Sequence, residues 1–254
     1  MAALAQSVTE LAAIEGIYLL VAAALIAGLL RGFSGFGSAM VYLPIAAQVL
    51  PPIWVLTTLI MMDLLGPIPS VPKAWRAGDP RDVMRLGLGT LVGLPLGIAL
   101  LVLMAPETFR YVVSFLTLAL VAALAGGVRY NGQMDRRMVY GTGGVAGVVG
   151  GAVGLGGPPV IMLYMASPLP AERIRANILM YLMVFDVLTL GAYLVSGLLV
   201  FKAILLGLML AVPFLVAVQV GAWMFNPAHG RLYRAVAYAI IVLSALMGLP
   251  IWNG

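Results

Sequence analysis

Two aspartates stand near the middle of long apolar stretches of this sequence, Asp63 and Asp186. A carboxylate inside a hydrophobic segment is energetically costly and is often functional. A carboxyl group removed from water holds its proton more readily, so it can take up and release a proton near neutral pH. We predict Asp63 and Asp186 as proton-coupling residues. The alternative is a structural hydrogen bond to Thr57, Thr58, Thr189 or a backbone group.

Two glycine-rich stretches could carry a second kind of chemistry, the binding of an anion. The first reads Gly-Phe-Ser-Gly-Phe-Gly-Ser over residues 32–38, and the second reads Gly-Ala-Val-Gly-Leu-Gly-Gly-Pro over residues 151–158. Glycine at this density interrupts a helix, and within lipid such backbone is tolerated only where it is buried or lines a cavity. Each stretch precedes a short apolar run, and the free N–H groups at a helix start bind anions. The alternative is close packing of helices. The glycines that we predict to line an anion site are Gly35, Gly37, Gly154, Gly156 and Gly157.

Polar side chains near these stretches could donate hydrogen bonds to the same anion. Thr58 and Asn177 are 119 residues apart and occupy corresponding places in the two halves of the chain. Arg31 could also face an anion, but it fits a pattern of basic loops, which favours a place at the membrane boundary instead. For all of these polar side chains, the alternative role is to form hydrogen bonds between helices. The further substrate-binding residues that we predict are Ser34, Ser38, Thr57, Thr58, Asn177 and Arg175.

The elements that position these residues must lie in a membrane. Of the 254 residues, 63% are hydrophobic and only 9% are charged, and the mean hydropathy is +1.10. A soluble domain needs charge on about a quarter of its residues. This chain lacks that charge, so its surface must face lipid. The predicted fold class is all-α, a polytopic membrane protein with the lipid bilayer as its partner.

Composition also argues against several other kinds of site. The chain has no cysteine and one histidine, which excludes disulfides and thiolate sites and leaves little material for a hydrolytic or metal centre. Its formal charge of +5 comes from basic residues without a long cluster, so nucleic acid is not an expected partner. No nucleotide-binding P-loop is present. We therefore expect no enzyme, no cofactor and no metal.

Glycine, proline and charge clusters divide the chain into ten apolar segments. A spanning helix needs about 20 apolar residues, and the second segment of each half is shorter than that. It is either a thin span or one limb of a re-entrant hairpin. The segments cover residues 14–31, 36–50, 53–72, 83–104, 108–127, 138–152, 156–169, 174–196, 201–224 and 232–250.

The basic residues predict how these segments are oriented. With the N-terminus outside, every second connection is cytoplasmic, and those connections hold twelve of the fourteen lysines and arginines, Arg31 included. Only Arg110 and Lys202 fall on the other face. Such asymmetry is the positive-inside pattern. If only the short segments failed to cross, the positive loops would be scattered over both faces, so we reject that version. We expect a multi-pass protein of the cell (inner) membrane with both termini on the non-cytoplasmic side.

The glycine stretches belong to a longer internal repeat with a shift of 119 positions. Over residues 32–51 this shift pairs Gly32/Gly151, Gly35/Gly154, Gly37/Gly156, Val41/Val160, Ala47/Ala166, Leu50/Leu169 and Pro51/Pro170. Each half holds five segments, an odd number, so the two halves must have opposite orientations. Inverted repeats are common in secondary transporters, whose site lies at the repeat interface near mid-membrane. We predict a first inverted repeat over 14–127, a basic cytoplasmic linker over 128–137 and a second inverted repeat over 138–250.

At these motifs the chain resembles the sulfite exporter TauE/SafE family of membrane proteins. The resemblance is carried by Gly-Phe-Ser-Gly-Phe-Gly with an apolar run to Pro44, and by its repetition as Gly-Ala-Val-Gly-Leu-Gly-Gly-Pro-Pro. It implies transport of sulfite, sulfoacetate or another sulfur-containing or organic anion. The chain departs from the family's pattern at Ser38-Ala39 and at Pro158, where the family often has glycine. The residues to which the resemblance extends are Gly35, Gly37, Gly154, Gly156 and Gly157.

These patterns together predict a secondary transporter of a small anion, with sulfite or an organosulfonate as the expected substrate. Alternating access would expose a glycine-lined midplane site first to one side and then to the other. Proton coupling is a further hypothesis. Two alternatives remain: an anion channel with the same site, and a cation transporter that uses Asp63 and Asp186. Saturable exchange would favour the transporter, and conductance far above turnover rates would favour the channel.

Overall fold

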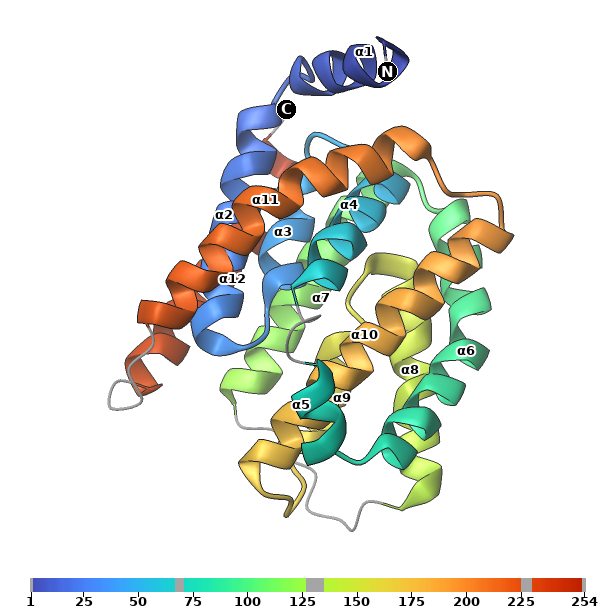
Figure 1. Cartoon of the computed structure of the whole chain (residues 1–254), viewed down its shortest axis with the longest axis vertical. Helices are drawn as coiled ribbons and strands as arrows, with labels where there is room; N and C mark the ends of the chain where they lie inside the picture. Colours follow the sequence, from blue (N-terminus) through green and yellow to red (C-terminus); the bar gives the residue numbers. More distant parts are fainter. Residues whose placement is uncertain (1, 67–70, 127–134, 225–229, 253–254) are drawn as a thin grey trace. The chain divides into compact units, whose positions relative to one another are not determined.

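The computed structural model describes residues 2–66, 71–126, 135–224 and 230–252, and the regular structure within these ranges is entirely helical. The predicted all-α class is therefore confirmed. The helices, shown in Figure 1, are α1 (Ala2–Ala12), α2 (Ile17–Ser34), α3 (Ser38–Ala46), α4 (Pro52–Leu65), α5 (Val71–Ala77), α6 (Pro80–Leu103), α7 (Pro106–Ala125), α8 (Arg136–Val153), α9 (Gly157–Met165), α10 (Ala171–Val195), α11 (Phe201–Met224) and α12 (Gly230–Gly248), followed by a 3-10 turn at Pro250–Trp252.

Each of the ten predicted segments contains a helix, but the third segment is divided. In place of 53–72, α4 ends at Leu65 and a separate helix, α5, begins at Val71. Pro67 and Pro69 follow α4 in the sequence, and a residue before proline is disfavoured in helical conformation. Positions 67–70 of this segment lie outside the described residues, as do positions 128–134 of the predicted linker. The sequence prediction had no counterpart of α1 or α5, which have 11 and 7 residues and cannot cross a membrane.

Five helices of the described chain are long and apolar enough to cross a membrane: α2, α6, α7, α10 and α11. The chain is therefore a multi-pass membrane protein. The helices α3 and α9 differ from these, because each has nine residues. At 1.5 Å per residue each is about 14 Å long, roughly half the thickness of the hydrocarbon core. Neither helix reaches across the bilayer by itself, in line with the short second segment predicted for each half.

The chain forms two compact units, and each combines segments from the early and the late part of the sequence. Unit 1 comprises Met1–Leu65, Ala105–Val121 and Leu199–Gly254, and unit 2 comprises Gly66–Met104 and Ala122–Leu198. Unit 1 thus contains α2, α3 and α4 with α11 and α12, and unit 2 contains α8, α9 and α10 with α5 and α6. The predicted sequence repeats, 14–127 and 138–250, concern a different division and stay a prediction.

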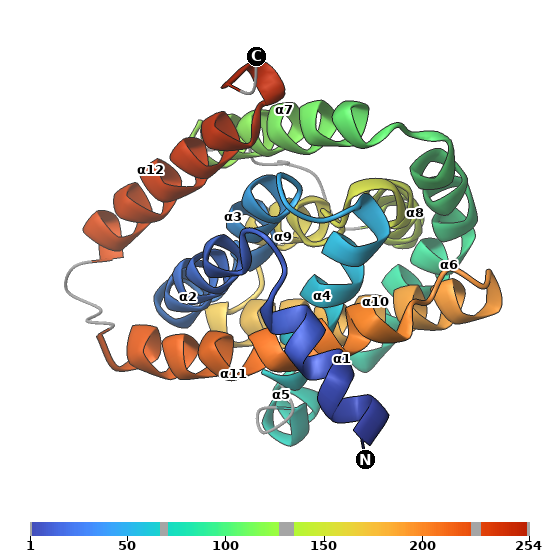
Figure 2. The ribbon, with the colours of Figure 1, turned by 90° about the horizontal axis from the view of Figure 1, so that it is seen from above.

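In unit 1, glycines bring α2 and α11 into direct backbone contact, and both views show the two helices side by side (Figures 1 and 2). A Cβ atom on Gly28 would collide with the Phe214 carbonyl, and one on Gly221 would collide with the Leu29 carbonyl. Small residues of this kind let helices approach closely where lipid supplies no hydrophobic drive.

Unit 2 repeats this device between α6 and α8, which also lie side by side in both views (Figures 1 and 2). Gly89, Gly93 and Gly97, one per turn of α6, face backbone atoms of α8. The Thr90 hydroxyl donates to the Gly143 carbonyl at 3.1 Å, which adds a hydrogen bond across the same contact. The packing explanation therefore fits these glycines, none of which belongs to the predicted anion site.

Candidate functional site

Each unit contains the same local arrangement of a helix, a left-handed glycine, a short helix and another helix. Gly35 ends α2 with φ 81°, and Gly154 ends α8 with φ 76°. The N–H of Gly35 donates to the Arg31 carbonyl, and that of Gly154 donates to the Gly150 carbonyl, both at 2.8 Å. L-residues with a side chain rarely adopt this conformation, so glycine is required where the helix stops. The sequence prediction of interrupted backbone at these two places is confirmed.

The glycines of the first turn differ in the space beside them. Gly35 is exposed, and no atom of the described residues lies within 4 Å of the position that its Cβ would take. Gly37 also has a left-handed backbone, with φ 92°, but a Cβ there would lie 2.6 Å from a methyl group of Leu30. Open space beside Gly35 suits the predicted role in lining a site. Gly37 instead starts α3 against a packed side chain.

Side chains of α10 occupy the space beside the glycines of the second turn. A Cβ atom on Gly156 would lie 2.5 Å from the Phe185 ring, and one on Gly157 would lie 3.0 Å from a methyl group of Leu182. Both glycines are buried, and Gly156 has ordinary helical φ of −72°. These contacts favour the packing explanation for Gly156 and Gly157, whose predicted substrate role is untested.

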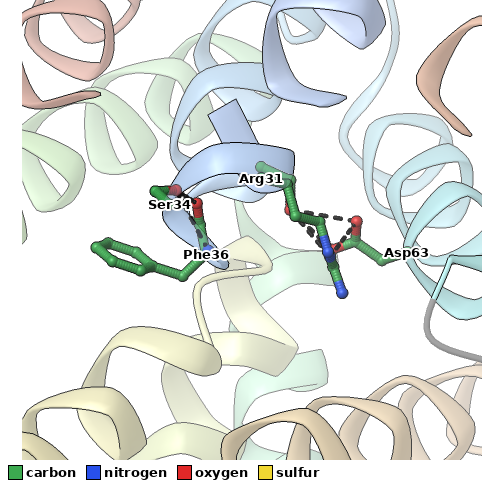
Figure 3. Close-up of polar contacts among 5 residues, drawn as sticks. Arg31, Ser34, Phe36 and Asp63 are labelled. Atoms are coloured by element: carbon green, nitrogen blue, oxygen red, sulfur yellow. Dashed lines mark hydrogen bonds and ion pairs between the residues drawn. The ribbon is translucent and has the colours of Figure 1, made fainter. Parts of the chain in front are cut away.

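A buried charged cluster lies beside the Gly35 turn, formed by Arg31, Ser38 and Asp63. Arg31 on α2 reaches Asp63 on α4, with 2.5 Å between Nη1 and Oδ1 (Figure 3). The same Nη1 donates to the Ser38 hydroxyl at 3.1 Å, and that hydroxyl lies 3.1–3.2 Å from both carboxylate oxygens of Asp63. The Arg31 and Asp63 side chains are only 12% and 13% exposed.

The donor and acceptor groups of the cluster fix the direction of its hydrogen bonds. Arginine can only donate hydrogen bonds, and Ser38 has a single hydroxyl proton. Ser38 therefore accepts from Arg31 and donates to Asp63. The cluster joins two predicted site residues, Ser38 and Asp63, to Arg31, for which the sequence favoured the membrane boundary over an anion-facing role.

Other predicted residues of unit 1 use their hydroxyl groups locally. The Ser34 hydroxyl lies 2.6 Å from the Leu30 carbonyl and 2.7 Å from the Phe36 carbonyl, and it holds the turn together (Figure 3). Thr57 donates to the Ile53 carbonyl at 2.8 Å. Such bonds to the preceding helical turn are common for serine and threonine within helices.

Thr58 has a partner on another helix. Its hydroxyl lies 2.9 Å from the Tyr42 hydroxyl, and it also donates to the backbone carbonyl of Trp54 or Val55, each at 2.9 Å. Tyr42 and Thr58 are both fully buried. The hydrogen bond between α3 and α4 is the alternative that the sequence left open for Thr58.

In unit 2, Asn177 holds the start of α6. Its Oδ1 accepts a hydrogen bond of 2.6 Å from the backbone N–H of Asp79, which caps α6 by accepting from the N–H of Arg81 at 3.0 Å. The Tyr164 hydroxyl lies close enough to Asn177 to interact with it. Neither this hydroxyl nor Asn177 Nδ2 has a well-formed hydrogen bond to a described residue, although both are fully buried.

Two predicted residues on α10 lie in contrasting surroundings. Asp186 is 7% exposed and interacts with the Tyr181 hydroxyl. Arg175 is exposed on the first turns of the helix, whereas Asn177 two residues later is buried. Residues two apart on a helix face different directions. Arg175 and Asn177 therefore do not act together on one side of α10.

A match to a protein-family model decides the family of the chain. The model of the sulfite exporter TauE/SafE family matches residues 20–248 of the 254. The chain belongs to this family. No curated protein and no solved structure gives a significant match.

Membership of the TauE/SafE family makes the chain a membrane transporter with a small anion as its substrate. The matched region includes both glycine turns and the Arg31, Ser38 and Asp63 cluster. Within the described residues, no group of three or more histidine, cysteine, aspartate or glutamate side chains could hold a metal ion.

For this TauE/SafE chain, sequence reasoning did not foresee the contacts of Arg31 with Ser38 and Asp63. Arg31 fits the pattern of basic loops, and this pattern was enough to explain its position in the sequence. One signal did point elsewhere: Arg31 and Ser38 are seven residues apart on either side of the Gly35 turn. A chain reversal at Gly35 brings positions before and after it close together. The pairing with Asp63, 32 residues later, depends on how α4 packs and had no sequence signal.

Proposed function

We propose that the chain is a secondary transporter of sulfite or an organosulfonate and that its anion site lies at the Gly35 turn. The observation that carries this proposal is the Arg31, Ser38 and Asp63 cluster beside the open side of that turn. Arg31 supplies a planar donor group suited to the oxygens of a sulfur oxyanion. Ser38 adds a hydroxyl donor, and Gly35 permits a close approach to the backbone.

Alternating access and proton coupling complete the proposal. Rocking of one inverted half against the other would expose the site to each side in turn. Asp63 is the first candidate for coupling because it contacts the proposed anion-binding arginine. Asp186 remains a second candidate on the strength of its burial in α10.

The cluster argues against the cation alternative. A cation carrier would need a negative charge free to bind its substrate, whereas the charge of Asp63 is already balanced by Arg31 at 2.5 Å. An anion channel would use the same site, so the rate of anion movement distinguishes a channel from a transporter. A transporter saturates and exchanges labelled for unlabelled anion, while a channel conducts at rates far above enzyme-like turnover.

Proteoliposome uptake with a panel of labelled anions tests this function. The panel contains sulfite, sulfate, isethionate and acetate, each measured with and without a pH gradient. We expect saturable uptake of sulfite or isethionate above that of acetate, and loss of this uptake in Arg31→Gln. The matched control is Arg136→Gln, an exposed arginine at the start of α8. Equal uptake of every anion, or full uptake by Arg31→Gln, would contradict the proposal.

A further inference from the structure

The Arg31, Ser38 and Asp63 cluster is not a requirement of the local fold, because unit 2 builds the same arrangement without it. At the repeat shift of 119, Arg31 corresponds to Gly150, Ser38 to Gly157 and Asp63 to Leu182. These counterparts also occupy corresponding places in unit 2. Gly157 starts α9 as Ser38 starts α3, and a Cβ atom on Gly157 would lie 3.0 Å from a Leu182 methyl group.

The contact between the short helix and the following helix is thus ionic and polar in unit 1 and aliphatic in unit 2. A buried ion pair is weak support for stability, since apolar residues of similar volume often replace it without loss. Unit 2 supplies that replacement within the same chain. The charges of unit 1 therefore require an explanation other than packing.

Asp63 depends on Arg31 for its charge balance. Among the described helices, α3 and α11 have the most extensive packing against α4. On α3, Ser38 donates to Asp63, and the one titratable group, Tyr42, is bonded to Thr58. On α11 the one charged residue, Lys202, pairs with Glu10. Within unit 1, Arg31 is the cation that contacts Asp63.

From these contacts we infer that the transported anion and a proton bind together: the anion takes the place of the Asp63 carboxylate on Arg31, and Asp63 takes up a proton. This inference rests on the proposed function. An anion on Arg31 leaves Asp63, whose side chain is only 13% exposed, without its balancing charge, and an ionised carboxylate is disfavoured there. The carboxylate becomes a carboxylic acid by gaining one proton from water, and no other bond changes.

Joint binding of anion and proton determines their relative direction of transport. Anion and proton occupy the loaded state together, so they cross the membrane in the same direction. A sulfonate monoanion and one proton carry no net charge, so their movement responds to a pH gradient and not to membrane potential. The opposite arrangement, in which anion and proton exchange, would require the anion to expel the proton. The pair of Arg31 and Asp63 does not favour expulsion of the proton, because the anion and the ionised carboxylate compete for one cation.

The first test measures protons directly on the unmodified protein. Purified transporter in weakly buffered detergent solution is mixed with isethionate, whose charge does not change with pH in this range. We expect uptake of about one proton per bound anion, by linkage between the two equilibria. Binding without proton uptake, or with proton release, would overturn the inference while leaving the proposed function intact. Absence of binding and transport for the whole anion panel would overturn both.

The second test uses proteoliposomes and two variants. Isethionate uptake by the unmodified chain should alkalinise the outer medium and should not change when a potassium diffusion potential is applied. Asp63→Asn should still exchange isethionate but without proton movement, because its neutral amide does not compete for Arg31. Asp135→Asn, which changes an exposed aspartate before α8, is the matched control and should behave like the unmodified chain. Potential-driven uptake by the unmodified chain, or proton-coupled uptake by Asp63→Asn, would overturn the inference.

Discussion

At the scale of single residues, the ionic cluster of unit 1 combines little solvent exposure with hydrogen bonds that join all three of its side chains. Removing one member should be more damaging than removing both charges. We expect Arg31→Met to lower the free energy of unfolding by about 3 kcal/mol, because it strands a buried carboxylate. Arg31→Met with Asp63→Leu, which imitates Leu182 of unit 2, should recover most of that loss. Unfolding in mixed detergent micelles measures both, and a double variant less stable than the single one would contradict this.

The two left-handed glycines of the first turn separate strain from function. Gly35→Ala and Gly37→Ala should each lose about 1–2 kcal/mol of stability from the backbone conformation. Gly37→Ala should lose more, since its Cβ meets fully buried Leu30. Gly35→Ala should instead reduce anion transport beyond its effect on stability, since it fills open space at the proposed site. Thermal unfolding and uptake at equal protein density measure the two effects, and equal effects of the variants on both would refute the distinction.

At the scale of helices, the α6 and α8 contact depends on glycine. Gly93→Ala should destabilise unit 2 strongly, because the added Cβ would overlap the Gly144 carbonyl on the neighbouring helix. Gly141→Ala on α8 is the matched control, since no described atom lies within 4 Å of its Cβ position. That control should gain about 0.5–1 kcal/mol from lower backbone entropy in the unfolded chain. The measurement is unfolding in detergent, and a similar change in both variants would argue against glycine-mediated packing.

Helix α1 is attached to α11 by an exposed ion pair between Glu10 and Lys202, with 2.8 Å between Oε2 and Nζ. The hydrogen bond from Lys202 lowers the pKa of the Glu10 carboxyl below its ordinary value. A group whose pKa is lowered in the folded state stabilises that state above its unfolded pKa and loses this contribution as the pH falls through the folded pKa.

The hydrogen-exchange protection factors of α1, which are corrected for the intrinsic pH dependence of amide exchange, should therefore be larger at neutral pH than at a pH below the Glu10 pKa. Lys202→Met should abolish this difference. Glu15→Gln, which changes another exposed carboxylate close to α1 in the sequence, is the comparison variant and should keep the difference. Unchanged pH dependence in Lys202→Met would show that the pair does not hold α1. High salt should reduce the effect in the unmodified chain, because exposed ion pairs are screened.

At the scale of the whole molecule, the distribution of basic residues predicts which side of the membrane each loop faces. The chain has no cysteine, so single cysteines can be introduced without background labelling. Asp135→Cys should react only with reagents that reach the cytoplasm, and Thr108→Cys and Ser196→Cys should react from the outside. All three positions are exposed. Labelling of Asp135→Cys from outside in intact cells would reverse the proposed orientation, and mixed labelling at one position would contradict a single orientation.

The two basic residues that fall outside the positive-inside pattern have specific partners in unit 1. Lys202 pairs with Glu10, and Arg110 Nε donates to the Gly248 carbonyl at 3.3 Å. A helix C-terminus carries partial negative charge on its last carbonyl groups, which suits a nearby cation. These partners give both residues a local reason to lie where they do, so they need not count against the predicted topology.

The sequence by itself determined the features that depend on local composition. Long apolar runs require helices in lipid, since a backbone without water must bond within its own segment. Left-handed turns require glycine, which is why the glycine pattern alone locates the helix breaks at Gly35 and Gly154. The paired glycine stretches also indicated the family, which the family match over residues 20–248 confirms.

Only the tertiary structure decided which side chains meet. Arg31 and Asp63 lie on different helices, and their contact depends on the rotation of α2 and α4 about their own axes, which packing decides. For the same reason Gly35 has open space whereas Gly156 is filled by Phe185, although the two glycine stretches look alike in sequence. Local composition determines where the helices form. Which side chains of distant helices touch depends on how the helix surfaces pack together, and no local sequence pattern specifies that packing.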